Sequence, residues 1–198
     1  MNSKDIEAIM LVGKSTRLKN KAFIRINNKE LFRYGYEVLE EIFKEVKIIC
    51  NKQVCKKFSS LSINIIEENL DIGPLGAIYV GMNNTKSEYV SVFGCDMPFL
   101  NKDLIKFLCS KVTKDGIVPL NNRGQVEPLH AIYKRGKILN VLDSETLKEE
   151  RRIQKMLNIL DIKYIPAPEI KKFDPELLSF RNINTKDDLK WMMEFLHG

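Results

Sequence analysis

Histidine and suitably spaced cysteines are scarce in this chain, which limits the metal chemistry that it can support. Its 198 residues include two histidines and four cysteines, and no two cysteines have C-x-x-C spacing. A structural zinc site needs about four such ligands in a compact arrangement, so none is expected. We interpret the cysteines as reduced thiols; they are Cys50, Cys55, Cys95 and Cys109.

Long apolar runs are also missing. No stretch approaches the roughly 20 apolar residues that span a bilayer, and residues 1–5 lack a basic region followed by an apolar block. We therefore expect a cytoplasmic protein with no membrane partner. The net charge is +6, but lysine and arginine are spread along the chain and no nucleic-acid motif is visible. The expected ligands are nucleotides or phosphorylated metabolites, not nucleic acid.

What the sequence does contain is an alternation of strand-like and helix-like segments. The predicted strands are residues 6–12, 46–50, 63–66, 89–93, 116–119 and 162–165, and the predicted helices are 31–46, 75–82, 102–111, 145–160 and 186–196. This order favours an α/β fold with a mostly parallel sheet and helices on both faces. A strand-like run at 127–134 without a preceding helix predicts an antiparallel excursion. Length and 44% hydrophobic content fit a single domain, 1–198.

One carboxylate stands at the end of a predicted strand. The run 89–93 leads through Gly94 into Cys95-Asp96-Met97-Pro98. Ligands of open α/β sheets bind at the carboxyl ends of strands, where a carboxylate is well placed to hold a divalent cation. The alternative is that Asp96 caps the next helix, but Asn101 already suits that position. We therefore predict Asp96 to be a metal ligand.

The first predicted strand leads into a basic loop. Residues 11–21 read L-V-G-K-S-T-R-L-K-N-K. Main-chain N–H groups can bind phosphate oxygens while lysine or arginine neutralises the remaining charge, so the loop suits a polyphosphate. It matches neither the P-loop nor G-x-G-x-x-G, and an ordinary basic surface loop is the alternative.

Four segments occur together along the chain: the basic loop, Gly73-Pro74-Leu75-Gly76, Cys95-Asp96-Met97-Pro98 and Asn182-Ile183-Asn184-Thr185. In this order they resemble the nucleotidyltransferases. With Glu127-Pro128-Leu129 and Glu150-Arg151-Arg152 added, the chain resembles more narrowly the molybdenum cofactor guanylyltransferases. The resemblance covers essentially the whole length. It implies a Rossmann-like three-layer fold, Mg²⁺ as cofactor, and transfer of GMP from GTP to the phosphate of molybdopterin with release of pyrophosphate.

The resemblance also implies roles for individual residues. Asp96 and Asn184 would hold the metal, and Arg17 and Lys21 would bind the β- and γ-phosphates, so that Asp96, Lys21 and Arg17 carry the catalysis. The alternative for Asn182 to Thr185 is a turn and helix cap. Further nucleotide contacts are expected at Leu11, Gly13, Ser15, Asn51, Asp71 and Gly76.

The base and the acceptor leave more than one assignment open. Guanine presents two adjacent donors that one carboxylate can accept, and we assign this role to Asp71, with Asn51 as a second contact. Glu67 and Glu68 are the alternatives. For the acceptor we expect Arg151 and Arg152, with Glu127 and His130 on the same side; a solvated helix and a hydrogen-bonded core histidine are the competing interpretations.

The basic loop departs from the family pattern Leu-x-Gly-Gly-x-Ser-x-Arg-Met-Gly. The second glycine is missing, Leu18 replaces the methionine and Lys19 the next glycine, while Gly13 and Ser15 still align. Two other functions therefore stay open: a nucleotidyltransferase for another phosphorylated metabolite, for example with CTP, and a nucleotide-binding homologue without catalysis. A glycosyltransferase is disfavoured because Asp-x-Asp is absent. We expect a monomer or a weak homo-oligomer.

Overall fold

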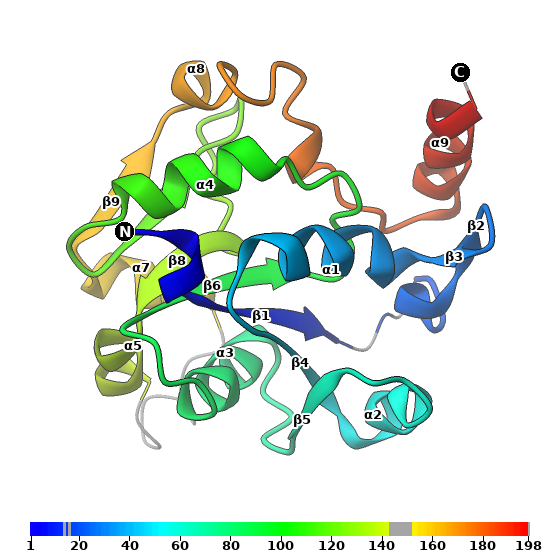
Figure 1. Ribbon diagram of the computed structural model, residues 1–198, viewed down its shortest axis with the longest axis horizontal. Helices are drawn as coiled ribbons and strands as arrows, with labels where there is room; N and C mark the ends of the chain where they lie inside the picture. The colour runs from blue at the N-terminus through cyan, green and yellow to red at the C-terminus, as the bar shows by residue number, and fades with distance from the viewer. Residues whose placement is uncertain (14, 16, 143–151, 198) are drawn as a thin grey trace.

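A seven-stranded sheet forms the centre of the computed structural model, which describes residues 1–13, 15, 17–142 and 152–197 (Figure 1). Its order is β5-β4-β1-β6-β8-β7-β9. The strands are β1 (Glu7–Val12), β4 (Val46–Asn51), β5 (Asn64–Glu68), β6 (Tyr89–Gly94), β7 (Gly116–Pro119), β8 (His130–Lys134) and β9 (Ile162–Ile165). Only β8 runs antiparallel to its neighbours, among the pairings described. The predicted α/β fold, with its antiparallel excursion, is confirmed.

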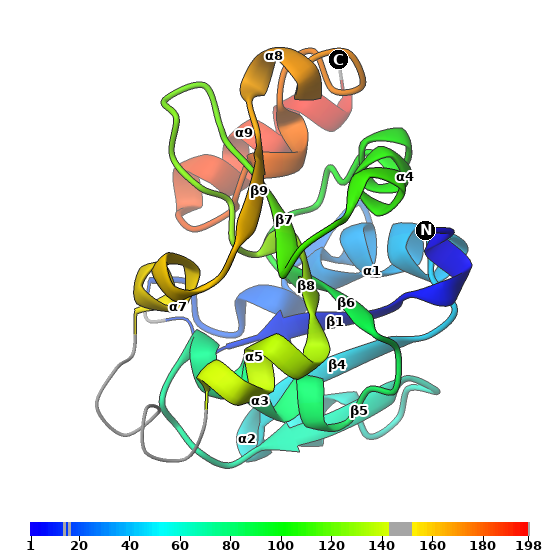
Figure 2. The same cartoon turned by 90° about the vertical axis from the view of Figure 1, so that its left-hand side faces the viewer.

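Helices cover both faces of this sheet, which gives three layers (Figure 2). The helices are α1 (Leu31–Ile42), α2 (Lys52–Phe58), α3 (Pro74–Asn83), α4 (Lys102–Lys111), α5 (Arg135–Val141), α7 (Ile153–Ile159), α8 (Ala167–Ile170) and α9 (Lys186–His197). One core packs α1 and α4 against the sheet, and a second core packs α3, α5 and α7 against the other face. A hairpin of β2 (Arg25–Ile26) and β3 (Lys29–Glu30) lies beside α9 at one end (Figure 1). The expectation of one domain stays a prediction.

The central strands are apolar because both of their faces are covered. All six residues of β1 and all six of β6 are buried, as expected of strands inside a parallel sheet. Helix α1 ends at Ile42, before the predicted end at Val46, because Phe43 adopts an extended conformation and is 2% exposed in the core. The predicted helix 145–160 is described only from Ile153, since 143–151 lie outside the described residues.

Two cysteines are paired in this structure. Cys50 and Cys55 form a disulfide between the end of β4 and α2, with their Cα atoms 5.8 Å apart. The prediction of reduced thiols is therefore wrong for this pair, because the strand-to-helix turn folds the chain back on itself. Cys95 and Cys109 are free and buried, and burial raises the pKa of each thiol to about 12. No helix in the described ranges has the length and apolar character needed to cross a membrane.

Candidate functional site

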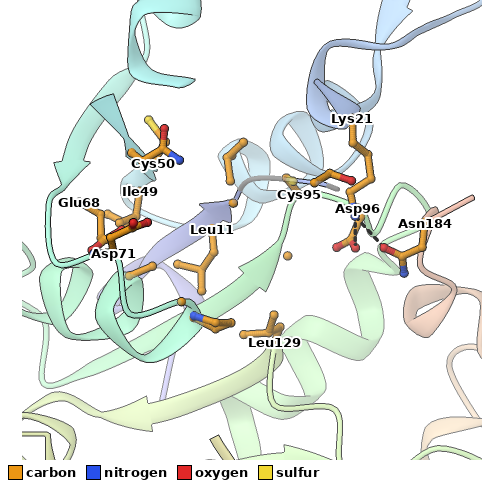
Figure 3. A pocket seen from close by; sticks show the side chains of 18 of the residues that line it. Leu11, Lys21, Ile49, Cys50, Glu68, Asp71, Cys95, Asp96, Leu129 and Asn184 are labelled. Carbon is orange, nitrogen blue, oxygen red and sulfur yellow. Dashed lines mark hydrogen bonds and ion pairs between the residues drawn. The ribbon is translucent and has the colours of Figure 1, made fainter. Parts of the chain in front are cut away.

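A pocket of about 410 Å³ opens where β1, β4, β5 and β6 end (Figure 3). The carboxyl ends of parallel strands meet at one edge of a sheet, so loops distant in sequence converge there. The predicted site residues that line the pocket are Leu11, Gly13, Ser15, Arg17, Lys21, Asn51, Asp71, Asp96 and Asn184. Residues chosen at predicted strand ends and residues implied by the resemblance therefore line one connected cavity, and their roles stay predictions.

Three polar side chains meet at one end of the pocket. The Lys21 ammonium donates hydrogen bonds to Asp96 Oδ2 at 2.7 Å and to Asn184 Oδ1 at 2.8 Å. The Lys21 and Asp96 side chains are only 12% and 19% exposed. The three residues come from a short helix, the exit of β6 and the turn before α9. The family resemblance implies a link between Asn184 and Asp96 through the metal, and the contacts of both residues with Lys21 were not predicted.

Main-chain contacts hold this end of the pocket together. The N–H of Ile183 donates to the carbonyl of Asp96 at 2.9 Å, and the N–H of Cys95 donates to the carbonyl of Leu11 at 3.2 Å. Gly94 leaves room for the Asp96 carboxylate, because a Cβ at Gly94 would lie 2.6 Å from Asp96 Oδ1. Gly94 is thus a site residue that the sequence interpretation used only as a strand exit.

The oxygens around Lys21 suit a hard divalent cation. A carboxylate and an amide oxygen already share one positive charge, and both are ligands that Mg²⁺ accepts. In the part of the chain that the structure describes, no group of three or more histidine, cysteine, aspartate or glutamate side chains could hold a metal. Mg²⁺ normally completes its shell with water and substrate phosphates, so the donor set fits this ion and not a structural zinc ion.

The serine of the basic loop, Ser15, lines the pocket and makes a hydrogen bond within the loop. Ser15 Oγ accepts a hydrogen bond from the N–H of Leu18 at 3.2 Å, and Leu18 is 6% exposed. Leu18 therefore anchors the loop in the core at the place where the family pattern has methionine. A Cβ at Gly13 would meet nothing within 4 Å, so packing does not require glycine there. Lys14 and Thr16 lie outside the described residues.

Two carboxylates mark the opposite end of the pocket. Glu68 ends β5 and is 9% exposed, and its Oε1 accepts hydrogen bonds from the N–H groups of Leu70 at 2.6 Å and Asp71 at 2.8 Å. This turn places Asp71 in the left-handed region, with φ of 52°. Figure 3 shows Glu68 and Asp71 together, with Leu11 between them and the Asp96 end. Glu68, one of the two alternatives to Asp71, thus lies in the pocket, whereas its neighbour Glu67 is exposed.

Asn51 has a local structural role beside its place in the pocket. Its Oδ1 caps α2 by accepting hydrogen bonds from the N–H groups of Gln53 and Val54, both at 3.1 Å. The carbonyl oxygen of this amide is therefore engaged within the chain, and any ligand contact uses the NH₂ group as a donor.

Gly76, Glu127, Arg152 and His130 do not line this pocket. Gly76 sits in α3, where a Cβ would lie 2.7 Å from the Ile72 side chain, so packing alone accounts for glycine. Glu127 accepts a hydrogen bond from Asn121 at 2.9 Å, and burial raises the pKa of its carboxyl. Arg152 directly precedes α7, and Arg151 lies outside the described residues.

His130 is a core residue without the expected hydrogen bond. It is 0% exposed and lies edge-on to Phe93 and Phe180, with ring centroids 5.2 Å apart in both cases. Neither ring nitrogen has a partner among the described residues. Burial lowers the pKa of His130 to about 4, so the ring is neutral near pH 7. The register that pairs His130 with Phe93 directs the imidazole into the core, and Leu129 lines the pocket instead.

Comparisons with known proteins agree with this geometry. A family model described as the MobA-like NTP transferase domain matches residues 8–164. Probable molybdenum cofactor guanylyltransferases of Methanosarcina acetivorans and Pyrococcus furiosus are 30% and 31% identical to the chain; the matches cover 99% and 96% of it and 93% and 97% of the relatives. The crystal structure of molybdopterin-guanine dinucleotide biosynthesis protein A from Archaeoglobus fulgidus is 28% identical, covers 96% of this chain and 98% of that one, and superposes with a TM-score of 0.83. Since the family model spans most of the chain, the protein belongs to the MobA-like NTP transferase domain family and is a nucleotidyltransferase.

Proposed function

We propose that the protein transfers GMP from GTP to the phosphate of molybdopterin and releases pyrophosphate. The supporting observation is the polarity of the pocket. Its Asp96 end carries Lys21 beside two hard oxygens, which suits a metal-bound triphosphate, and its Glu68 end carries carboxylates, which suit a base with hydrogen-bond donors. Arg17 also lines the pocket. The names of the relatives supply the acceptor.

The proposed chemistry needs charge neutralisation more than proton transfer. A phosphomonoester is already anionic near neutral pH, so its oxygen attacks the α-phosphorus without a general base. The barrier lies in bringing two anions together and in stabilising the leaving pyrophosphate. Asp96 and Asn184 would hold Mg²⁺, which supplies charge neutralisation at the phosphates when bound. No histidine is needed, in keeping with the burial of His130 away from the pocket.

Lys21 has two uses in this proposal. Its ammonium donates to the oxygens of Asp96 and Asn184, so it satisfies two partly buried acceptors. A divalent cation held by Asp96 and Asn184 would compete with the ammonium for these oxygens, and Lys21 would then contact the β- and γ-phosphate oxygens together with Arg17.

The carboxylates at the Glu68 end favour guanine over cytosine. Guanine N1–H and its exocyclic amine are two adjacent donors, so one carboxylate can accept from both. The corresponding edge of cytosine has one donor, its exocyclic amine, beside two acceptors, N3 and O2, so a carboxylate that accepts from the amine has its second oxygen against an acceptor. The NH₂ group of Asn51 can donate to guanine in addition. We assign the main contact to Glu68, because two main-chain N–H groups fix its orientation, and we keep Asp71 as a second contact. This selectivity argues against a CTP-dependent enzyme.

The residues proposed to bind the acceptor molecule are assigned from the order of the family motifs along the chain. Arg151 and Arg152 would contact the acceptor phosphate, and Glu127 the pterin. Arg152 stands at the start of α7, and Glu127 follows the turn between β7 and β8.

Calorimetric titration of the four nucleoside triphosphates with Mg²⁺, followed by a turnover assay with molybdopterin, tests the proposal. We expect GTP to bind most tightly and the complete mixture to yield the guanine dinucleotide and pyrophosphate. Preferred binding of CTP would support the alternative enzyme, and GTP binding without product would support a nucleotide-binding homologue that lacks catalysis. Either result would contradict the proposed function.

A further inference from the structure

Helix α9 begins next to the Asp96 end of the pocket and is tied to it by one aspartate. Asp188, in the first turn of α9, accepts three hydrogen bonds at Oδ2: from the N–H of Asn184 at 3.0 Å, and from the N–H and the hydroxyl of Thr185, both at 2.8 Å. The N–H of Asp188 in turn donates to Thr185 Oγ1 at 3.1 Å. The reciprocal bonds between Thr185 and Asp188 form a capping box.

One of these bonds goes beyond what a helix cap needs. A capping box satisfies the N–H of the cap residue, here Thr185, whereas Asp188 also holds the N–H of Asn184, one residue earlier. Asn184 is the residue whose Oδ1 contacts Lys21 beside Asp96. On its other side, the N–H of Ile183 is bonded to the Asp96 carbonyl, and Ile183 is 0% exposed. The main chain of Asn184 is therefore fixed on both sides.

The charge of Asp188 is suited to this task. Hydrogen bonds from main-chain N–H groups to a carboxylate are charge-assisted and are stronger than neutral ones. Asp188 receives two such bonds, from Asn184 and Thr185.

We propose that Asp188 is a positioning residue for the metal-binding end of the pocket: it fixes the Asn184 main chain so that Asn184 Oδ1 and Asp96 Oδ2 face one shared cation. The proposal rests on the function proposed above. It gives α9 a part in cation binding, although α9 lies beyond residues 8–164 that the family model matches.

The chain offers a matched control on the same turn. Asp187 precedes Asp188, carries the same charge in the first turn of α9, and is exposed. Asp187→Ala removes a charge near the helix N-terminus as Asp188→Ala does, but leaves Asn184 held. Asp188→Asn keeps one acceptor oxygen and tests the role in a less disruptive way.

Trp191 reports on whether α9 stays in place. It is the single tryptophan of the chain, and it lies edge-on to Phe99 at 5.6 Å, close to the Asp96 loop, with the Arg181 guanidinium 3.8 Å from its ring centroid. An unchanged tryptophan emission spectrum in a variant therefore shows that α9 is still docked.

The test measures Mn²⁺ binding by electron paramagnetic resonance in the presence of GTP, and GMP binding without metal by calorimetry. For Asp188→Ala we expect the Mn²⁺ dissociation constant to rise about 10- to 100-fold, as when residues that orient metal ligands are removed. GMP affinity and the Trp191 emission should stay unchanged, Asp188→Asn should give a smaller rise, and Asp187→Ala none.

The outcomes separate the two proposals. The positioning role alone is overturned if the wild type binds GTP and Mn²⁺ and both Asp188 variants bind Mn²⁺ as tightly as the wild type does. Equal losses of Mn²⁺ and GMP affinity in Asp188→Asn, or a shifted Trp191 emission, would show a purely structural role and also overturn it. Wild-type protein that binds neither GTP nor Mn²⁺ overturns the proposed function and this role with it.

Discussion

Replacement of Glu68 by glutamine should remove the preference for the guanine exocyclic amine. The glutamine keeps one acceptor oxygen for the N–H groups of Leu70 and Asp71, so the turn after β5 is preserved, but it loses the charge and the second acceptor. A hydrogen bond to a charged group contributes about 1.5–3 kcal/mol. Since about 1.4 kcal/mol is tenfold in affinity, we expect GTP binding to weaken about 10- to 150-fold.

The assay compares GTP with inosine triphosphate, which lacks only the exocyclic amine. In the wild type GTP should bind more tightly by a similar factor, and in Glu68→Gln the two affinities should converge. The control is Glu67→Gln on the same strand, whose side chain is exposed. A GTP preference that survives in Glu68→Gln but disappears in Asp71→Asn would assign the contact to Asp71. Survival in both variants would refute the reasoning.

Three further predictions concern charge. Lys21→Met should weaken GTP binding more than GMP binding in calorimetry, because Lys21 is assigned to the β- and γ-phosphates; equal losses would indicate a general basic surface. The pKa of His130 is lowered by burial to about 4. The folded protein therefore favours the neutral ring, and His130 contributes to the free energy of unfolding fully above about pH 6.5 and less as the pH falls towards 4. In urea titrations, His130→Leu should reduce the loss of unfolding free energy between these pH values by about 3 kcal/mol. Burial raises the pKa of Glu7, but bonds from Lys47 and two main-chain N–H groups outweigh it and lower the pKa to about 2. Glu7→Gln should cost about 3 kcal/mol near pH 7, less as the pH falls from 4.5 towards 2, because it removes one of the two carboxylates that pair with the buried Lys47, the other being Glu45; an unchanged unfolding midpoint would contradict this.

Features that depend only on neighbouring residues in the sequence could be predicted, and the position of Asp96 is the best example. A buried strand, a glycine and a carboxylate follow one another directly, so neighbouring residues fix the position of Asp96 at the sheet edge. Helix α4 was predicted with its observed bounds, since Asn101 caps it and its apolar residues have helical spacing.

Features that depend on register or on distant partners could not be predicted. Whether Glu67, Glu68 or Asp71 faces the pocket depends on the phase of β5 and on the left-handed turn after it. The burial of His130 follows from its pairing opposite Phe93, which no local pattern shows. Asn184 is 163 positions from Lys21, and their contact was not predicted; the family resemblance linked Asn184 only to Asp96, through the metal.

The most direct test of the account is a turnover assay of the wild type against Asp96→Asn, with GTP, Mg²⁺ and molybdopterin. Asparagine keeps the shape of the side chain but removes the only carboxylate bonded to Lys21 at this end of the pocket, within the described residues. The account predicts that the wild type forms the guanine dinucleotide and one pyrophosphate per transfer, and that Asp96→Asn forms neither while its thermal unfolding shows an intact fold. Pyrophosphate release by Asp96→Asn at the wild-type rate would contradict the account.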